Sequence, residues 1–248
     1  MSNRLRLVIN IGNTNIKLGY YDTQGALQTQ SYPVALAEDD AFMSNLAFIE
    51  GVSFTQVYVA SVVPAVNEKI SKLVQAKLGI TPKFITYQDV EGTLDTSGYS
   101  QGTVGVDRLM GCVGAQTYPA IIFDLGTAVS ISVMDKNANF LGGAILPGAQ
   151  MHLDALSQNA AMLPELSLAD IKNANFVIGS DTKACLVSGL IFGMASVIDG
   201  FARKIQEEIG YTCELVLTGG FSKYVRPHLE EVYRYEEHLV LMGILGLN

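Results

Sequence analysis

The chain has 248 residues, of which 49% are hydrophobic, and a formal net charge of −8. The apolar content excludes a disordered chain, and the excess of acid argues against nucleic acid or an anionic membrane as a main partner. The three cysteines are far apart and form no CxxC pair, which indicates reduced thiols and a cytoplasmic protein.

The first predicted element is a hairpin over residues 7–22, LVINIGNTNIKLGYYD. Two apolar strands flank a tight Gly-Asn-Thr turn. Gly12 has no Cβ, so an anionic group could approach the main-chain N–H groups closely, and Lys17 adds a positive charge. These residues favour a site for a nucleotide phosphate, although an ordinary β-hairpin explains the same pattern.

The rest of the first half alternates strands and helices, which is typical of an α/β fold. Residues 89–103 carry several Gly, Ser and Thr and predict an exposed loop. The pair Tyr118-Pro119 breaks the chain after the helix that follows this loop, and we place a domain boundary there. The predicted strands cover 26–34, 56–63 and 82–86, and the predicted helices cover 39–49, 64–79 and 105–116.

Residues 121–135, IIFDLGTAVSISVMD, repeat the first hairpin at an offset close to half of the chain, with Asp124 aligned to Asn10. The repeat predicts two domains, 1–117 and 118–248. Two such hairpins facing one another would hold a polyphosphate from both sides. The expected fold is therefore α/β, with two duplicated actin-like (ribonuclease H-like) domains whose mixed sheets are flanked by helices.

The second half continues with predicted strands at 139–146, 214–217 and 232–234, and with helices at 149–159 and 181–210. A Thr-Gly-Gly turn, a further helix and an apolar tail helix complete it. The apolar run 186–198 is too short to span a bilayer. Gly189 and Gly193 would let another helix pack closely on the long helix, and that helix could belong to a second subunit or to the same chain.

Two carboxylates are candidates for chemistry. Asp124 follows an apolar strand, where a carboxylate costs stability unless it is paired or bound to a cation. Asp107, in GTVGVDRLM, stands at the start of a helix beside Arg108, and could accept a proton from a hydroxyl acceptor. A capping role for Asp107 explains the same position.

Taken together, the motifs resemble those of the type III pantothenate kinases, of the acetate kinase and actin-like superfamily. The matching segments run in order over nearly the whole chain: NIGNTNIKLG, ASVVP, GVDR, DLGTAVS, FLGGAILPG, IGSDT, LTGG and HLVLMGILG. The resemblance implies phosphorylation of pantothenate by ATP to 4′-phosphopantothenate, the first step of coenzyme A synthesis. It also implies Mg²⁺, a monovalent cation (K⁺ or NH₄⁺) and a homodimer.

The resemblance also implies a role for each matching residue. Asp107 is the implied proton acceptor, and Asp124 is the implied ligand of the monovalent cation. The Tyr99 match is loose, because its spacing to GVDR is one residue shorter than expected. Pantothenate is expected at Tyr99, Gly105, Val106, Asp107, Arg108 and Thr182, and ATP at Asn10, Ile11, Gly12, Asn13, Thr14, Asn15, Ile16, Lys17, Thr127, Gly219 and Gly220.

Two positions depart from the family pattern. Asn10 replaces an Asp that helps to hold Mg²⁺, and Ser132 replaces an acid in the second hairpin. The amide brings no negative charge, so we expect metal binding and rate to suffer. Two alternatives therefore stand beside the pantothenate kinase: a catalytically weakened or non-catalytic relative that acts through a ligand or protein partner, and a kinase for another small hydroxylated acid.

Overall fold

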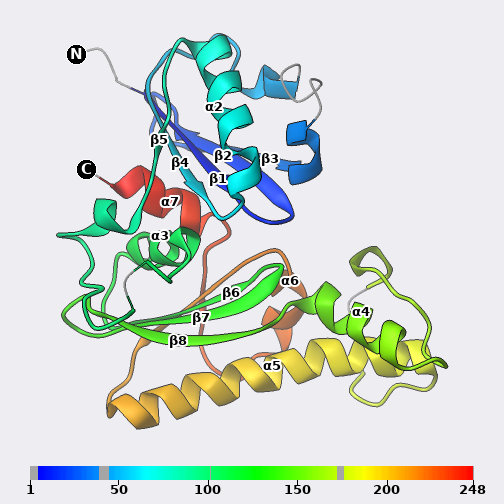
Figure 1. Ribbon diagram of the computed structural model, residues 1–248. Coiled ribbons are helices and arrows are strands. Elements are labelled where there is room, and N and C mark those ends of the chain that lie inside the picture. Colours follow the sequence, from blue (N-terminus) through cyan, green and yellow to red (C-terminus); the bar gives the residue numbers. More distant parts are fainter. Residues whose placement is uncertain (1–4, 39–44, 101, 172–175, 248) are drawn as a thin grey trace. The chain divides into compact units, whose positions relative to one another are not determined.

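The computed structural model describes residues 5–38, 45–100, 102–171 and 176–247, and these contain two five-stranded mixed sheets (Figure 1). In each sheet the first three strands form antiparallel hairpins, and the two later strands join them in parallel. The sheets therefore share one plan, which confirms the predicted duplicated α/β architecture and both hairpins. The strand orders are β3-β2-β1-β4-β5 and β10-β9-β6-β7-β8.

The strand bounds lie close to those predicted. The first sheet contains β1 (Leu5–Ile11), β2 (Asn15–Tyr21), β3 (Leu27–Pro33), β4 (Phe54–Ser61) and β5 (Lys83–Phe84). The second contains β6 (Ala120–Leu125), β7 (Ala128–Met134), β8 (Phe140–Pro147), β9 (Glu214–Thr218) and β10 (Arg234–Tyr235).

The helices begin and end where their capping residues stand. Pro64 opens α2, and Gly79 closes it in the left-handed conformation at φ +69°. Asp181 caps α5 by accepting the N–H of Ala184, and Gly210 closes that helix at φ +79°. In the part of the chain that the structure describes, the α-helices are α2 (Pro64–Leu78), α3 (Val106–Ala115), α4 (Ala149–Asn159), α5 (Thr182–Ile209), α6 (Ser222–Val225) and α7 (Leu239–Gly246).

Contacts divide the chain into two units. The first consists of residues 1–116 together with 238–248, and the second of residues 117–237. The tail helix α7 thus packs within the first unit, against α3 and β1. The predicted division into two domains, 1–117 and 118–248, stays a prediction.

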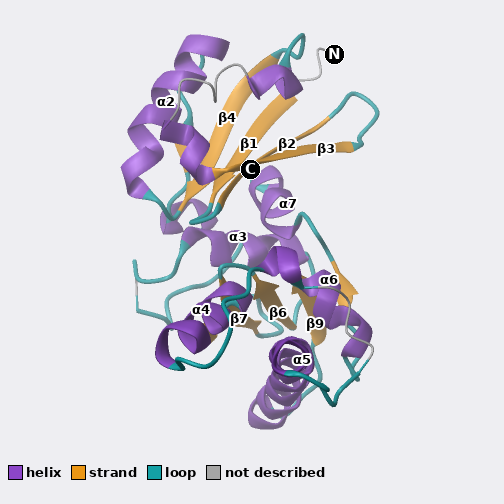
Figure 2. Ribbon diagram, turned by 90° about the vertical axis from the view of Figure 1, so that its right-hand side faces the viewer, coloured by secondary structure: helices purple, strands orange, loops and turns teal. Residues whose placement is uncertain are grey.

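The first sheet has two different faces because strand side chains alternate in direction. Leu7, Ile9 and Ile11 of β1 point to the side covered by α2, where they form the core with residues such as Ile70. Gly19 of β2 faces the opposite side, where Leu241 of α7 lies against it. Figure 2 shows α2 and α7 on the two sides of these strands.

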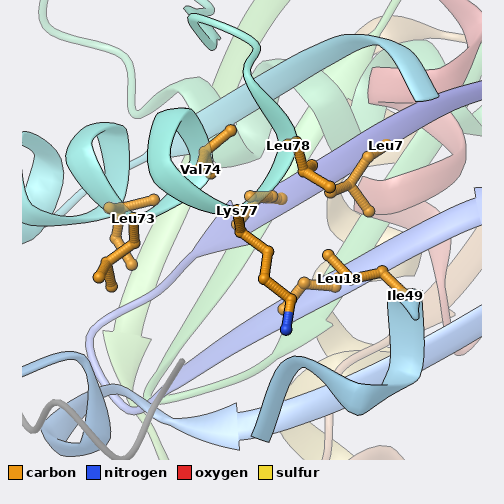
Figure 3. Close-up of a pocket in the computed structure, with 9 residues that line it drawn as sticks. Leu7, Leu18, Ile49, Leu73, Val74, Lys77 and Leu78 are labelled. Atoms are coloured by element: carbon orange, nitrogen blue, oxygen red, sulfur yellow. The ribbon is translucent and has the colours of Figure 1, made fainter. Parts of the chain in front are cut away.

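A narrow apolar crevice remains between α2 and the first sheet (Figure 3). At its edge the Lys77 ammonium lies 3.6 Å from Glu50 Oε1. The crevice belongs to the packing of the core, on the side of the sheet away from α7. Its lining consists of Leu7, Ile9, Leu18, Ile49, Ile70, Leu73, Val74, Lys77 and Leu78.

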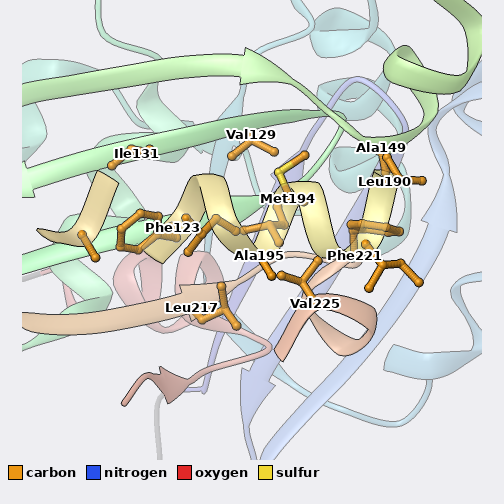
Figure 4. Close-up of a cluster of buried hydrophobic side chains, with 14 of the residues drawn as sticks. Phe123, Val129, Ile131, Ala149, Leu190, Met194, Ala195, Leu217, Phe221 and Val225 are labelled. Carbon is orange, nitrogen blue, oxygen red and sulfur yellow. The ribbon is translucent and has the colours of Figure 1, made fainter. Parts of the chain in front are cut away.

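In the second unit α5 packs along β6, β7 and β9 (Figure 4). Phe123, Ile131 and Leu217 of the sheet belong to the same core cluster as Met194 and Ala195 of the helix. By length and composition α5 could cross a membrane, but 44% of its most apolar window is buried inside the protein. The buried residues of α5, Met194 and Ala195 among them, belong to the core of this unit.

A buried carboxylate fastens the segment before β10 to the same helix. Asp199 of α5 is 2% exposed and accepts hydrogen bonds from the Glu230 N–H at 2.9 Å and the Tyr233 hydroxyl at 3.0 Å. Burial beside this carboxylate raises the pKa of the Tyr233 hydroxyl well above its usual range. The phenol therefore stays protonated and continues to donate.

Some predicted elements differ in extent. The helix predicted over 39–49 is a 3-10 helix at Asn45–Ile49, and residues 39–44 lie outside the described part of the chain. The loop predicted over 89–103 begins inside a short 3-10 helix, Tyr87–Val90, and buries Val90 and Leu94. The strand predicted at 232–234 is β10, which begins only at Arg234, and the helix after Gly220 is the short α6.

Candidate active site

The first predicted phosphate turn joins β1 and β2. The Gly12 N–H donates to the Asn15 carbonyl at 2.9 Å, and the Thr14 carbonyl accepts the Val34 N–H at 2.8 Å. A Cβ added to Gly12 would lie 3.4 Å from the Asn15 oxygen, which is an ordinary contact. The turn itself therefore does not require a glycine, and Asn13 and Thr14 are exposed. The small residue at position 12 leaves room above the backbone for a ligand.

Asn10 and Lys17 flank this turn as cross-strand partners in the register of β1 and β2. Their side chains share one face of the sheet, and it is the face that carries α7, because Leu7, Ile9 and Ile11 take the other. Asn10 Oδ1 is buried and has no hydrogen-bond partner in the described residues. A buried acceptor without a donor costs free energy, so this oxygen is suited to a ligand, a water or a hydrated cation.

The motif Gly105–Arg108 forms the start of α3. Gly105 is the residue before the first helical turn, and the Arg108 N–H donates to Asp107 Oδ1 at 2.8 Å. A Cβ on Gly105 would lie only 2.6 Å from the same Oδ1. Glycine at position 105 therefore makes the space in which the Asp107 carboxylate folds back over the helix N-terminus.

Burial raises the pKa of the Asp107 carboxyl above its ordinary value of 3.8, although the Arg108 N–H and guanidinium each lower it. Desolvation disfavours the charged form, and here it outweighs the two favourable contacts. A carboxylate with a raised pKa is a stronger base, which suits a proton acceptor. A simple helix cap that is stabilised by the N-terminus shows a lowered pKa instead.

Val62 connects the two motifs of the first unit. Its N–H donates to the Ile11 carbonyl at 3.0 Å, at the end of β1. Its Cγ1 lies 3.8 Å from a Cβ built on Gly105. The structure thus brings the first turn and the Asp107 motif together at the same end of the sheet. Tyr99 belongs to the same region, because it lines a small cavity with Leu109 of α3.

The second turn joins β6 and β7 in the second unit. Asp124 is the cross-strand partner of Ser130, so the two side chains share a face. Gly126 and Thr127 are exposed at the tip of the turn. A Cβ on Gly126 would lie 3.4 Å from Asp124 Oδ1, so the carboxylate stands directly below the turn. Ser132, on the same face of β7, is 2% exposed.

Two further loops of the second unit approach this turn, backbone against backbone. A Cβ on Gly148 would lie 2.0 Å from the Thr127 carbonyl oxygen. A Cβ on Gly219, where φ is +92°, would lie 2.5 Å from Leu125 N and 2.6 Å from Asp124 Oδ1. The structure therefore brings Asp124, Thr127 and Gly219 together. Thr182, by contrast, is exposed at the start of α5.

Sequence reasoning missed Val62 and Gly148. Val62 stands in the motif ASVVP and Gly148 ends FLGGAILPG, but neither motif says which residue makes a contact. The Pro147-Gly148 pair was the available signal, since a glycine after a proline often marks a position where the backbone turns or comes close to another segment. Nothing in the sequence marks Val62 as more than a strand residue.

A family model described as type III pantothenate kinase matches residues 6–204, which is more than half of the chain. The chain belongs to the type III pantothenate kinase family. The type III pantothenate kinase of Deinococcus radiodurans is 34% identical over 256 residues, which cover 97% of this chain and 95% of that relative. Membership confirms the family suggested by the ordered motifs.

Solved structures confirm the fold of this family member. A conserved putative Baf family transcriptional activator from Campylobacter jejuni gives a TM-score of 0.60 at 19% identity and covers 97% of this chain and 96% of its own. A putative N-acetylmannosamine kinase from Listeria monocytogenes gives 0.54 at 12% identity, covering 98% and 97%. At these identities the likeness concerns the fold alone.

We predict that Gly219→Ala destabilises this pantothenate kinase family member, while Gly220→Ala does not. The Gly219 Cβ would strike the Leu125 backbone in a left-handed conformation, whereas nothing lies within 4 Å of a Cβ on Gly220. We expect a loss of about 3 kcal/mol in the free energy of unfolding for Gly219→Ala. Urea denaturation of both variants measures the difference. Equal stabilities would show that the backbone approach at Gly219 has no energetic weight.

We predict that Asp107→Asn stabilises the protein at neutral pH relative to the natural chain. The folded-state pKa of Asp107 is raised above 3.8, so its contribution to stability is complete below 3.8 and is lost as the pH rises through the raised pKa. Asn keeps an acceptor for the Arg108 N–H. The variant should melt a few degrees higher at pH 7, and this advantage should vanish below pH 4. A variant that is less stable at pH 7 would identify Asp107 as an ordinary helix cap.

Proposed function

We propose that this chain transfers the γ-phosphoryl group of ATP to the 4′-hydroxyl of pantothenate, giving 4′-phosphopantothenate and ADP. Membership of the type III pantothenate kinase family supports this activity. The observation that carries it is the environment of Asp107, a carboxylate fixed at the start of α3 with a raised pKa, at the end of the sheet that carries the first turn.

The proposed reaction needs little chemistry from the protein beyond a base and charge stabilisation. Asp107 accepts the hydroxyl proton as the pantothenate oxygen bonds to the γ-phosphorus and the bond to the β,γ-bridging oxygen breaks. Arg108 positions the acceptor, together with Gly105 and Val106, and with Tyr99 and Thr182 as further contacts. The proton then leaves Asp107 for solvent, and ADP carries the released electron pair.

We assign the phosphates of ATP to the first turn, Asn10 to Lys17, and to Thr127, with Gly219 and Gly220 beside the nucleoside. Exposed N–H groups at a turn without side-chain cover favour an anion. The space over Gly12 and the exposure of Asn13, Thr14 and Thr127 support this assignment. Lys17 supplies positive charge in a chain whose net charge is −8.

The residues present fit a cation only in part. No group of three or more His, Cys, Asp or Glu side chains that could hold a metal occurs in the described residues. The buried Asn10 Oδ1 can accept from a metal-bound water, and Asp124 offers a carboxylate for a monovalent ion, K⁺ or NH₄⁺. When bound, Mg²⁺ neutralises charge on the β- and γ-phosphates. Asn10 contributes an oxygen but no charge to that task.

We also propose a cytoplasmic homodimer that binds neither nucleic acid nor membrane. The acidic balance and the three cysteines, none of which forms a disulfide, support the location. Nothing in the described chain lies within 4 Å of a Cβ on Gly189 or Gly193 of α5. The described chain therefore does not use these glycines for close helix packing, which leaves the subunit contact as their proposed purpose.

We expect ATP- and pantothenate-dependent ADP release by the purified protein with Mg²⁺ and K⁺, and a loss of about 10²–10⁴-fold in kcat for Asp107→Asn. The amide cannot accept the proton, while the fold and the nucleotide turns remain. A coupled ADP assay measures kcat and the KM for ATP, which should change little. Turnover by the natural chain that equals that of Asp107→Asn would reject the proposed mechanism.

Asn10 and Ser132 favour a second candidate, a relative that binds ligand but turns over slowly or not at all. We predict that Asn10→Asp restores a charge near the phosphates and lowers the Mg²⁺ concentration needed for half-maximal nucleotide binding by about 10-fold. Calorimetry with ATP at graded Mg²⁺ measures this without turnover. Gln30→Glu, which adds the same charge at an exposed position of β3 outside the turn, is the control.

The value of kcat distinguishes the full pantothenate kinase from the weakened relative. A kcat that is low in the natural chain and rises in Asn10→Asp supports the weakened relative. High natural activity with no gain in Asn10→Asp supports the full kinase and shows that the amide is sufficient.

A further inference from the structure

The helix that carries Asp107 touches the tail helix with no space between the two backbones. A Cβ on Gly243 of α7 would lie 1.9 Å from the Met110 carbonyl oxygen of α3. A Cβ on Gly114 of α3 would lie 2.1 Å from the Leu239 carbonyl oxygen of α7. Neither contact leaves room for one methyl group, so the position of α3 is fixed by α7 at both glycines.

The tail helix is in turn fixed to the hairpin that carries the first turn. Leu241 of α7 is buried, and its Cδ1 lies 3.0 Å from a Cβ built on Gly19 of β2. The Arg6 guanidinium of β1 donates to the carbonyls of Leu245 and Leu247 at the end of α7. The same guanidinium lies 4.8 Å from the centre of the Tyr58 ring, a cation–π contact that holds it in place.

These contacts form a chain from the phosphate turn to the proton acceptor inside the first unit. The hairpin β1–β2 holds α7, α7 holds α3, and the N-terminus of α3 holds Asp107. A packed interior passes a displacement on rather than absorbing it. Asp107 stands seven residues before Gly114, about 10 Å along a rigid helix, so a change of helix spacing or tilt moves the carboxylate.

We infer that α7 is the positioning element of the active site and that Gly114 and Gly243 are positioning residues for Asp107. The inference rests on the proposed function, in which Asp107 takes the proton of pantothenate and the first turn holds the phosphates of ATP. The two glycines touch neither substrate. They set the distance between the carboxylate and the nucleotide turn. This contact explains why the motif HLVLMGILG has a glycine at position 243, where any side chain would strike the backbone of α3.

The test compares Gly243→Ala with Gly246→Ala on the same helix. The first puts a methyl group into the Met110 backbone, while the second meets only Val113 Cγ1 at 4.0 Å. For Gly243→Ala we expect kcat to fall about 10- to 100-fold, as for a misplacement near 1 Å. The Kd for a non-hydrolysable ATP analogue, measured by calorimetry, should stay close to that of the natural chain. Gly246→Ala should match the natural chain in both.

Arg6→Gln provides a milder displacement, because it removes the bonds to the end of α7 without adding bulk. It should lower kcat by a smaller factor than Gly243→Ala, again with nucleotide affinity retained, and it decides the question if Gly243→Ala does not fold. A folded Gly243→Ala variant whose kcat equals that of the natural chain would overturn the inference. If Gly243→Ala does not fold, the same result in Arg6→Gln would overturn it. Equal losses of kcat and nucleotide affinity would also overturn it, since they indicate general damage to the unit. A natural chain without pantothenate phosphorylation would reject the proposed function itself.

Discussion

The alternation of side chains along β1 and β2 is the constraint on which the first unit depends. Leu7, Ile9 and Ile11 must face α2 to bury their apolar surface, and the period of two then leaves Asn10 and Lys17 on the opposite face. A slip of one residue would exchange the two faces. The burial of three aliphatic side chains thus determines where the polar residues of the phosphate turn stand, before any ligand is present.

The elements with strong local signals could be predicted from the sequence. Pro64 and Gly79 bracket α2, and Asp181 and Gly210 bracket α5, because each residue has a backbone preference that acts without tertiary context. The repeated hairpins were visible for a similar reason, since the same turn residues recur between apolar strands. The short β10 was misplaced because its pairing with β9, and not its own composition, fixes its ends.

The residues of the candidate site also differ in whether the sequence alone could identify them. The residues of the two turns and of GVDR could be found because they stand in contiguous motifs. The environment of Asp107 could not, because its raised pKa follows from burial, and burial is a property of the packed unit. The contacts of Val62, Gly148 and Gly243 were equally hidden. Each depends on the approach of a backbone segment that is distant in sequence. A single glycine or valine in the sequence does not indicate which segment will contact it.

The place of α7 has a consequence for how the chain is made. The first unit begins with β1 and is completed only by residues 238–248, while the whole second unit lies between these two parts of the sequence. During synthesis the N-terminal sheet therefore leaves the ribosome before the helix that covers one of its faces, and that face stays open until α7 has followed. Removal of α7 would therefore uncover one face of a sheet whose strands all lie before the second unit in the sequence.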